Sequence, residues 1–206
     1  MKVILILTCL FLQPITNQNQ RIMESSFIYI NYKYGSIPAK GYEKTEEKRA
    51  GGLAGGHVTC TIDQTVYGFT DEGSGEDTHI IPSTNHPNGY WQVETITDWN
   101  AKMVGEKYMV IPVLITKQQK TDLFKLLNQY IKKAPYDYAF FGIRCASAMH
   151  DLLGDAKIIP HVAFGIVWIK YFYPSSFGKY MKSLAKKKGW QIQYYTGRKS
   201  RIWDSF

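Results

Sequence analysis

Cysteine is scarce in this chain, with three residues among 206. Cys9 lies in an apolar N-terminal segment, which leaves Cys60 and Cys145 for the rest of the chain. A single disulfide between two cysteines is too little to stabilise a domain of this size. A disulfide-rich scaffold is therefore excluded, and a hydrophobic core must stabilise the fold. The two thiols either form one bridge, or one of them is a reactive group.

Long apolar runs are also lacking. The run from Val3 to Leu12 is about half the length that a membrane-spanning helix needs. One lysine precedes it and Pro14 with a polar stretch follows, which is the layout of a secretory signal peptide over residues 1–20. No small-x-small cleavage site is present, and Cys9 offers a lipidated N-terminal anchor as the alternative. We therefore expect one exported domain, residues 24–206, in the periplasm or cell envelope, either free or associated with the membrane.

Acidic residues are fewer than basic ones, 17 against 25, for a net charge of +8. Much of the excess lies near the C-terminus, where Asp204 is the one acidic residue. The basic residues there are Lys179, Lys182, Lys186, Lys187, Lys188, Arg198, Lys199 and Arg201. Such a cluster favours an anionic membrane surface or cell-wall polymer, or it is the solvated face of a helix. No recognition helix, zinc-finger spacing or aromatic ribonucleoprotein motif is present, so we expect no nucleic-acid partner.

Metal-binding motifs are missing as well. His79 and His86 lie with Glu76 and Asp77 in a glycine- and proline-rich stretch. Neither an HExxH-like nor a CxxC spacing supports a zinc site there. We expect no metal and no other cofactor, and we interpret His150 and His161 as structural or surface residues.

Hydrophobic periodicity predicts an α+β fold. We expect a strand within 26–38, then a hairpin of 57–62 and 65–70 around an Asp63-Gln64 turn. A long loop over 71–100 and a strand at 106–115 follow. The expected helices are one capped by Thr116 and Gln119, one from Cys145 and a basic one from Ser175 or Ser176, before a closing strand after residue 190.

Cys145 and His57 are the candidate catalytic residues. Cys145 lies in the first turn of its expected helix, where backbone N–H groups and the helix dipole stabilise a thiolate and can hold an oxyanion. His57 opens a strand behind a glycine-rich run, and Gly55 and Gly56 leave space for a substrate backbone in front of its ring. A thiol and an imidazole in these places form a nucleophile and a general base. The ordinary alternative is a buried core cysteine and a structural histidine.

The sequence GGHVTCTIDQTVYGF, followed later by YAFFGIRCASAMHDLL, resembles the permuted papain-like thiol superfamily. This superfamily includes permuted NlpC-type amidases, lecithin retinol acyltransferase-like proteins and a lipoprotein N-acyltransferase family. In all of them the histidine strand precedes the cysteine helix. The resemblance implies a circularly permuted papain-like fold, an antiparallel sheet packed against helices, with Cys145 as nucleophile and His57 as base.

Two features depart from the pattern of that superfamily. Arg144 stands where asparagine is common, and the polar residue that orients the histidine is not obvious. We expect that third residue on the next strand, at Asp71 or, less favoured, Thr70, unless a backbone carbonyl or a water replaces it. Arg144 and Tyr138 are expected to line the groove with Gly55 and Gly56, although Tyr138 also suits packing. Cys60 is expected to point to the opposite face and pack in the core.

The resemblance implies two substrate classes, peptidoglycan stem peptides and lipid acyl groups. We therefore expect an exported cysteine hydrolase that cleaves amide or peptide bonds, with cell-wall peptide as the favoured substrate. The first alternative is an acyltransferase that moves a fatty acyl group from membrane lipid to an amine through the same pair. The second is a non-catalytic exported binding module with an idle site.

Overall fold

The computed structural model describes residues 25–34, 37–38, 41, 56–72, 79–83 and 87–200. The predicted leader, Gly55 and His86 with its acidic neighbours lie outside these residues. The described elements are β1 (Ser25–Lys33), β2 (Ile37–Pro38), β3 (His57–Ile62), β4 (Thr65–Asp71), β5 (Gly89–Thr95), α2 (Ile96–Met103), β6 (Tyr108–Thr116), α3 (Lys117–Lys132), α4 (Cys145–Asp155), α5 (Phe164–Lys170), α6 (Pro174–Lys188), β7 (Gln193–Tyr195) and β8 (Lys199–Ser200).

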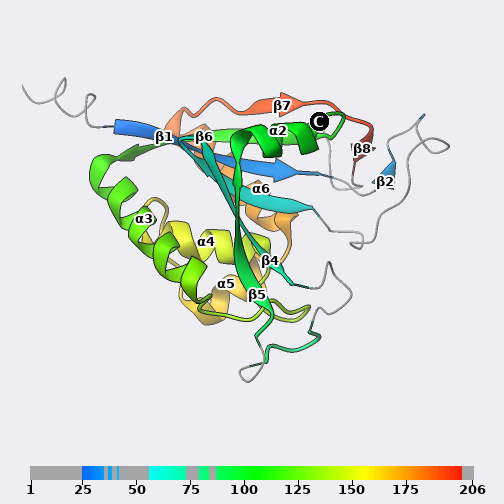
Figure 1. Ribbon diagram of the computed structural model, residues 1–206. Coiled ribbons are helices and arrows are strands. Elements are labelled where there is room, and N and C mark those ends of the chain that lie inside the picture. The colour runs from blue at the N-terminus through cyan, green and yellow to red at the C-terminus, as the bar shows by residue number, and fades with distance from the viewer. Residues whose placement is uncertain are drawn as a thin grey trace, which may run out of the picture.

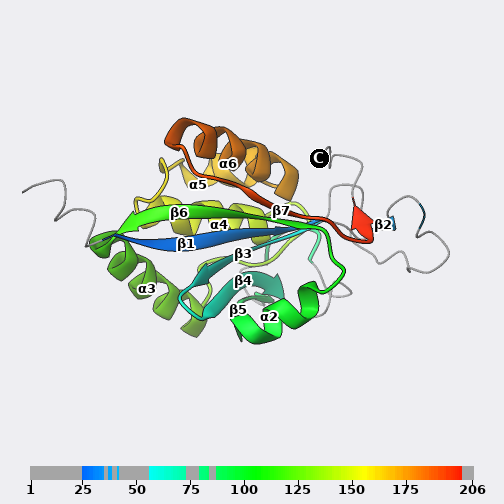
Figure 2. The same ribbon diagram turned by 90° about the horizontal axis from the view of Figure 1, so that it is seen from above.

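An antiparallel sheet of six strands forms the centre of the molecule, in the order β5-β4-β3-β1-β6-β7 (Figure 1). Strand alternation gives the sheet two different faces. Ile30, Val58 and Cys60 belong to one face, which packs against α3, α4 and α6 in the main core. On the other face, Val66 packs with Trp99 and Met103 of α2. Helix α2 lies beside β4 and β5 (Figure 2). The α+β class predicted from the sequence is confirmed, with helices on both faces of the sheet.

The predicted hairpin and all three predicted helices, α3, α4 and α6, are present. β3 and β4 pair from Thr59↔Gly68 to Ile62↔Thr65, with Asp63 and Gln64 in the turn. Asp63 has a φ of 54°, a conformation that aspartate tolerates better than most residues. The capping box of α3 is formed, because Thr116 Oγ1 accepts from the Gln119 N–H at 3.2 Å and Gln119 Oε1 accepts from the Thr116 N–H at 3.0 Å. The basic helix α6 begins at Pro174, whose ring fits a first helical turn.

The prediction of a long loop over 71–100 is wrong for the second half of that stretch, which contains β5 and α2. β5 pairs with β4 over seven positions, from Thr65↔Thr95 to Asp71↔Gly89. Thr95 then caps α2, accepting a 3.1 Å hydrogen bond from the Asp98 N–H. Glycine, proline and asparagine are concentrated before residue 89, and their density masked the alternating pattern of the strand that follows.

Strand β6 has neighbours of unequal length. It pairs with β1 along nine positions, from Ser25↔Thr116 to Lys33↔Tyr108, but with β7 at only three, the last being Val110↔Gln193. Pro112, which has no backbone N–H, lies just beyond that last pair. Among the helices of the described segments, none has the length and apolar character needed to cross a membrane.

Candidate active site at the start of helix α4

Helix α4 begins at Cys145 and holds this residue at its buried N-terminal end. Arg144 precedes the helix in an extended conformation, and its backbone N–H donates a 2.8 Å hydrogen bond to the Ser147 hydroxyl. That hydroxyl donates in turn to the Arg144 carbonyl oxygen at 3.1 Å. Ser147 thereby fixes the first turn of α4, which sets the position of the thiol.

Cys145 is 2 % exposed, and its sulfur is surrounded by backbone groups. Its S–H points to the Gly56 carbonyl oxygen at 3.9 Å. Burial raises the pKa of Cys145, while hydrogen bonds from the backbone N–H groups of Val58, Ala146 and Cys145 itself, together with the charge of Arg144, act to lower it. Burial prevails, so the thiol is neutral at pH 7 and needs a base to become a nucleophile.

The sulfur lies where strands β3 and β4 part. Their ladder ends at Thr59↔Gly68, although β4 continues with β5 as far as Asp71. Val58 is the first residue of β3 beyond the ladder, and its N–H bonds the sulfur instead of a β4 carbonyl. Gly56 and Val58 flank His57, so the sulfur contacts the peptide groups on both sides of the predicted base.

His57 begins β3 and leans across it toward β4. Its Nε2 lies 3.0 Å from the place where a Cβ on Gly68 would be. Burial and the nearby Lys33 lower the pKa of His57 to about 4, against the opposing effect of Asp71. The ring is therefore neutral at pH 7 and able to accept a proton. In this structure no hydrogen bond joins the ring to the Cys145 sulfur. Strand alternation places the ring with Thr59 on the α2 side of the sheet, opposite Val58 and Cys60, which face α4, so the start of β3 must turn before a proton can pass directly.

The residues proposed to orient His57 lie at the end of β4. Thr70 Oγ1 donates to Asp71 Oδ1 at 3.4 Å, and Asp71 is buried. Extending the hairpin register places Thr70 across from His57, as the Asp63-Gln64 turn predicted. The Asp71 carboxylate favours the protonated form of His57 and raises the pKa of Tyr138, so it acts electrostatically on both side chains.

The residue that directly faces the His57 ring nitrogen is Gly68, which the sequence analysis did not single out. The twist of a hairpin brings diagonal neighbours together, and the diagonal partner of His57 is Gly68 rather than Thr70. A glycine supplies no side chain to hold the ring. The hairpin register together with the diagonal rule would have indicated this position.

Replacing Gly68 with alanine should displace the His57 ring, because the new Cβ would lie 2.9 Å from Thr59 Cγ2 and 3.0 Å from His57 Nε2. We expect a loss of about 1–3 kcal/mol in the free energy of unfolding and a shift of the His57 ring resonances in NMR spectra. Gly165→Ala is the matched control, since nothing lies within 4 Å of its added Cβ. Unchanged His57 resonances in the Gly68 variant would contradict this geometry.

Glycine at position 56 is required by the backbone. Gly56 has a φ of 148°, and a Cβ there would lie 2.9 Å from the Lys33 carbonyl oxygen. From the sequence we expected Gly56 to keep a groove clear, and its positive φ is a second reason for glycine at this position.

Arg144 and Tyr138, the other predicted groove residues, contact each other. The guanidinium group of Arg144 hydrogen-bonds Tyr138 and lies 5.9 Å from the centre of its ring. It also lies 5.8 Å from the Phe140 ring and 5.3 Å from the Phe172 ring. Burial raises the pKa of Tyr138, so its phenol is neutral. Arg144 therefore keeps a positive charge beside the thiol while resting on aromatic faces.

An exposed apolar rim adjoins Arg144. It consists of Ile80, Ile81, Phe140 and Phe141, whose exposed fractions lie between 47 % and 72 %. Backbone hydrogen bonds from Phe140 N–H to the His79 carbonyl at 2.6 Å and from Phe141 N–H to the Ile80 carbonyl at 2.9 Å hold its two segments together. Apolar side chains gathered in this way are typical of a surface that meets an apolar ligand or a membrane.

Asp137 anchors that rim. Its carboxylate accepts from the Ser83 N–H at 2.7 Å and the Asn88 N–H at 2.8 Å, and it pairs with His79 Nδ1 at 2.7 Å. Although burial acts to raise the pKa of Asp137, these hydrogen bonds hold it below its usual value. Sequence reasoning considered His79 only as a metal ligand and missed this carboxylate, because the two residues are brought together by tertiary structure.

Cys60 is a core residue, as expected. It is buried on the sheet face that packs against the helices, and burial raises the pKa of its thiol. Cys60 and Cys145 are both free thiols, so the bridge considered from the sequence is not formed.

Comparison of the chain with protein-family models, with curated proteins and with solved structures finds no match in any of the three.

Proposed function

We propose that this chain is an exported thiol enzyme that transfers acyl groups through Cys145, within a permuted papain-like fold. The observation that carries the proposal is the position of the Cys145 sulfur. The sulfur lies at the N-terminus of α4, in contact with the peptide groups that flank His57. The order of the histidine strand before the cysteine helix, with that helix packed on an antiparallel sheet, supports the same assignment.

The reaction begins with a neutral thiol and a neutral imidazole. The start of β3 first turns so that the His57 ring reaches the α4 side of the sheet. His57 then takes the proton from the Cys145 S–H, and the sulfur attacks the carbonyl carbon of an amide or ester. The N–H groups of the first turn of α4 stabilise the oxyanion that forms. His57 then gives its proton to the departing amine or alcohol, which leaves a thioester on Cys145. Water or an amine attacks the thioester and restores the thiol. Because the thiol is 2 % exposed, a substrate reaches it only when a covering segment moves.

Hydrolysis of an amide bond, with cell-wall peptide as substrate, remains the first candidate reaction, and the basic surface of α6 suits an anionic wall polymer or membrane. Acyl transfer from a membrane lipid is the second candidate, and the apolar rim beside Arg144 is the observation that favours it. The idle binding module is the third, and the glycine facing the His57 ring favours it.

Mass spectrometry of the intact protein distinguishes these reactions. The chain is incubated with muropeptides or with phosphatidylglycerol–phosphatidylethanolamine vesicles, and a thioester on Cys145 is sought. A peptide adduct with release of free amine supports the hydrolase, and a fatty acyl adduct supports the transferase. For the transferase, Phe141→Ser should lower the yield from vesicles at least tenfold. Phe27→Ser, which changes a phenylalanine of similar exposure on β1, is the control and should leave the yield unchanged. No adduct from either substrate, with alkylation at Cys145 no faster than at Cys60, would overturn the proposal.

A further inference from the structure

The far end of helix α4 carries a second cluster of chemically active side chains, independent of the thiol site. Asp151 and Asp155 lie one helical turn apart, and His161 comes from the segment after the helix. One ligand atom of each residue lies within 4.8 Å of the other two. His161 Nε2 is 3.2 Å from Asp155 Oδ1.

Asp151 is the unusual member of this cluster. The residue is only 7 % exposed, yet no side chain or backbone group of the described residues donates a hydrogen bond to its carboxylate. A largely buried carboxylate beside a second carboxylate is costly unless a cation lies close to both. The cluster holds two carboxylates and one imidazole, so at least one carboxylate has no counter-charge within it.

The surrounding chain holds the cluster in place. The Tyr130 hydroxyl on α3 donates to Asp155 Oδ2 at 3.1 Å, which leaves Oδ1 directed to His161. The turn after α4 is fixed by hydrogen bonds from Lys157 N–H to the Gly154 carbonyl and from Ile158 N–H to the Leu153 carbonyl, both 2.9 Å. Such outer contacts orient metal ligands in proteins.

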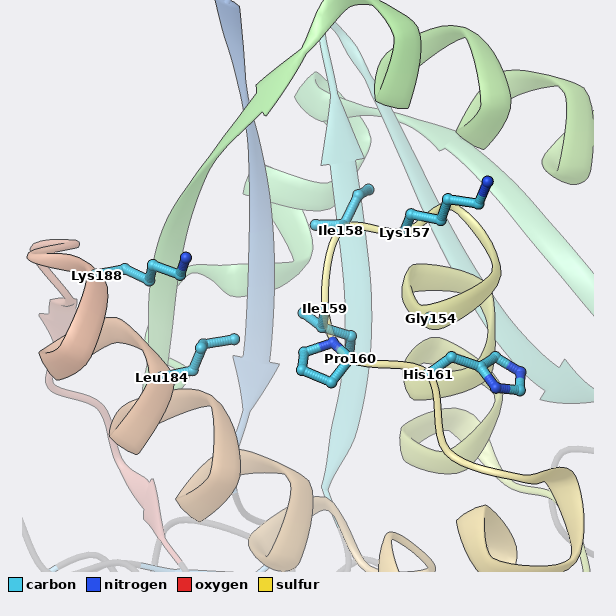
Figure 3. A pocket seen from close by; sticks show the side chains of 8 residues that line it. All are labelled: Gly154, Lys157, Ile158, Ile159, Pro160, His161, Leu184 and Lys188. Carbon is cyan, nitrogen blue, oxygen red and sulfur yellow. The ribbon is translucent and has the colours of Figure 1, made fainter.

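Gly154 allows His161 to approach the helix. A Cβ at position 154 would lie 3.3 Å from His161 Cα and 3.5 Å from His161 Cδ2. Figure 3 shows the His161 ring beside α4, at the edge of a cavity of about 420 Å³ whose other walls include Ile159, Pro160 and Leu184. One face of the cluster thus stays open to solvent, since Asp155 and His161 are exposed.

We propose that Asp151, Asp155 and His161 bind a divalent transition-metal ion, with Zn²⁺ as the probe that tests the site. Two carboxylate oxygens and one imidazole nitrogen suit Zn²⁺ and related ions better than Ca²⁺ or Mg²⁺, which prefer oxygen ligands throughout. The negative end of the α4 dipole favours a cation there as well. The ion would neutralise the buried carboxylate and join α4 to the segment that follows it, which is a stabilising role distinct from the chemistry of Cys145.

Isothermal titration of the metal-stripped full chain with Zn²⁺ tests the site, in a Cys145→Ser background so that the thiol does not compete. We expect one ion per chain and a rise in Tm on loading. Asp151→Asn and His161→Gln should each weaken binding at least tenfold. Gly154→Ala should weaken it while keeping all three ligands, because the new Cβ displaces His161. His79→Gln, which changes a histidine outside the cluster, is the control and should bind like the parent.

The metal-free proteins provide a second measurement. Asp151→Asn should have a higher Tm than its parent without metal, because the substitution removes a buried charge beside another carboxylate. This comparison also shows that the variant is folded. Absence of saturable binding at millimolar Zn²⁺, or equal affinity in the parent, Asp151→Asn and His161→Gln, would overturn the proposal.

Discussion

Replacing His57 with alanine should lower kcat/KM by about 10²- to 10⁴-fold and slow the alkylation of Cys145 by iodoacetamide at pH 7. The reason is the resting state of the pair. Burial raises the pKa of Cys145, so little thiolate exists at neutral pH, whereas the pKa of His57, lowered to about 4, leaves its imidazole free to accept the proton. Removing the base therefore removes the route by which the thiol becomes a nucleophile.

The pH dependence of the alkylation rate of Cys145 distinguishes this mechanism from one with a preformed thiolate. Between pH 5 and pH 9 the parent should alkylate at a nearly constant rate, because His57 is already deprotonated over that range. In His57→Ala the rate should rise with pH throughout, as thiol ionisation alone becomes limiting. Peptide mass spectrometry measures both thiols in one sample, and buried Cys60 on β3 is the internal reference for unfolding. Parallel profiles in parent and variant would show that His57 does not act on Cys145.

Acid should destabilise this protein through two buried histidines. His57 and His150 both have pKa values lowered from the ordinary 6.5 to about 4, chiefly by burial. Between these two values the unfolded chain binds more protons than the folded one, so stability rises with pH and is lost as pH falls from about 6.5 to 4. For His150, which is 0 % exposed, the loss approaches about 1.4 kcal/mol per pH unit within that window. Urea denaturation at a series of pH values measures it.

His150→Phe isolates this effect. The His150 ring stacks on Tyr171 with centroids 4.1 Å apart, and neither of its nitrogens has a hydrogen-bond partner among the described residues. Phenylalanine keeps the stacking and removes both unpaired nitrogens, so we expect a gain of about 1–3 kcal/mol at pH 7. The variant should also lose less stability than the parent between pH 7 and pH 5. An equal loss in both proteins would exclude His150 as a source of acid sensitivity.

The parts of the fold that were predicted correctly are those that local sequence determines. The hairpin around Asp63-Gln64 alternates on both arms, and α3 has both its capping box and its apolar stripe. β5 and α2 were not predicted, although Thr95 and Asp98 form a helix cap. The polar, glycine-rich residues before position 89 led us to interpret the whole stretch 71–100 as a loop. Composition averaged over a long window conceals a short strand.

The candidate site likewise has features that the sequence predicts and features that depend on tertiary packing. Placement of Cys145 at a helix start beside the strand of His57 followed from the order of elements along the chain. The ring of His57 over Gly68 depends on twist across the hairpin, and the Asp137 anchor and the cluster around Asp151 depend on segments far apart in sequence. Contacts of that kind require knowledge of tertiary packing, which one sequence does not carry.

Pro112 affects the tendency of this protein to aggregate through the edge of its sheet in concentrated solution. Beyond Val110, no further strand of the described chain pairs with the outer edge of β6. An open strand edge is a template on which another polypeptide can add and begin to aggregate. At Pro112 that row of donors is interrupted, so a strand from a neighbouring molecule cannot form a continuous ladder along β6. Pro112 thus protects this edge of the sheet from adding a strand of another molecule.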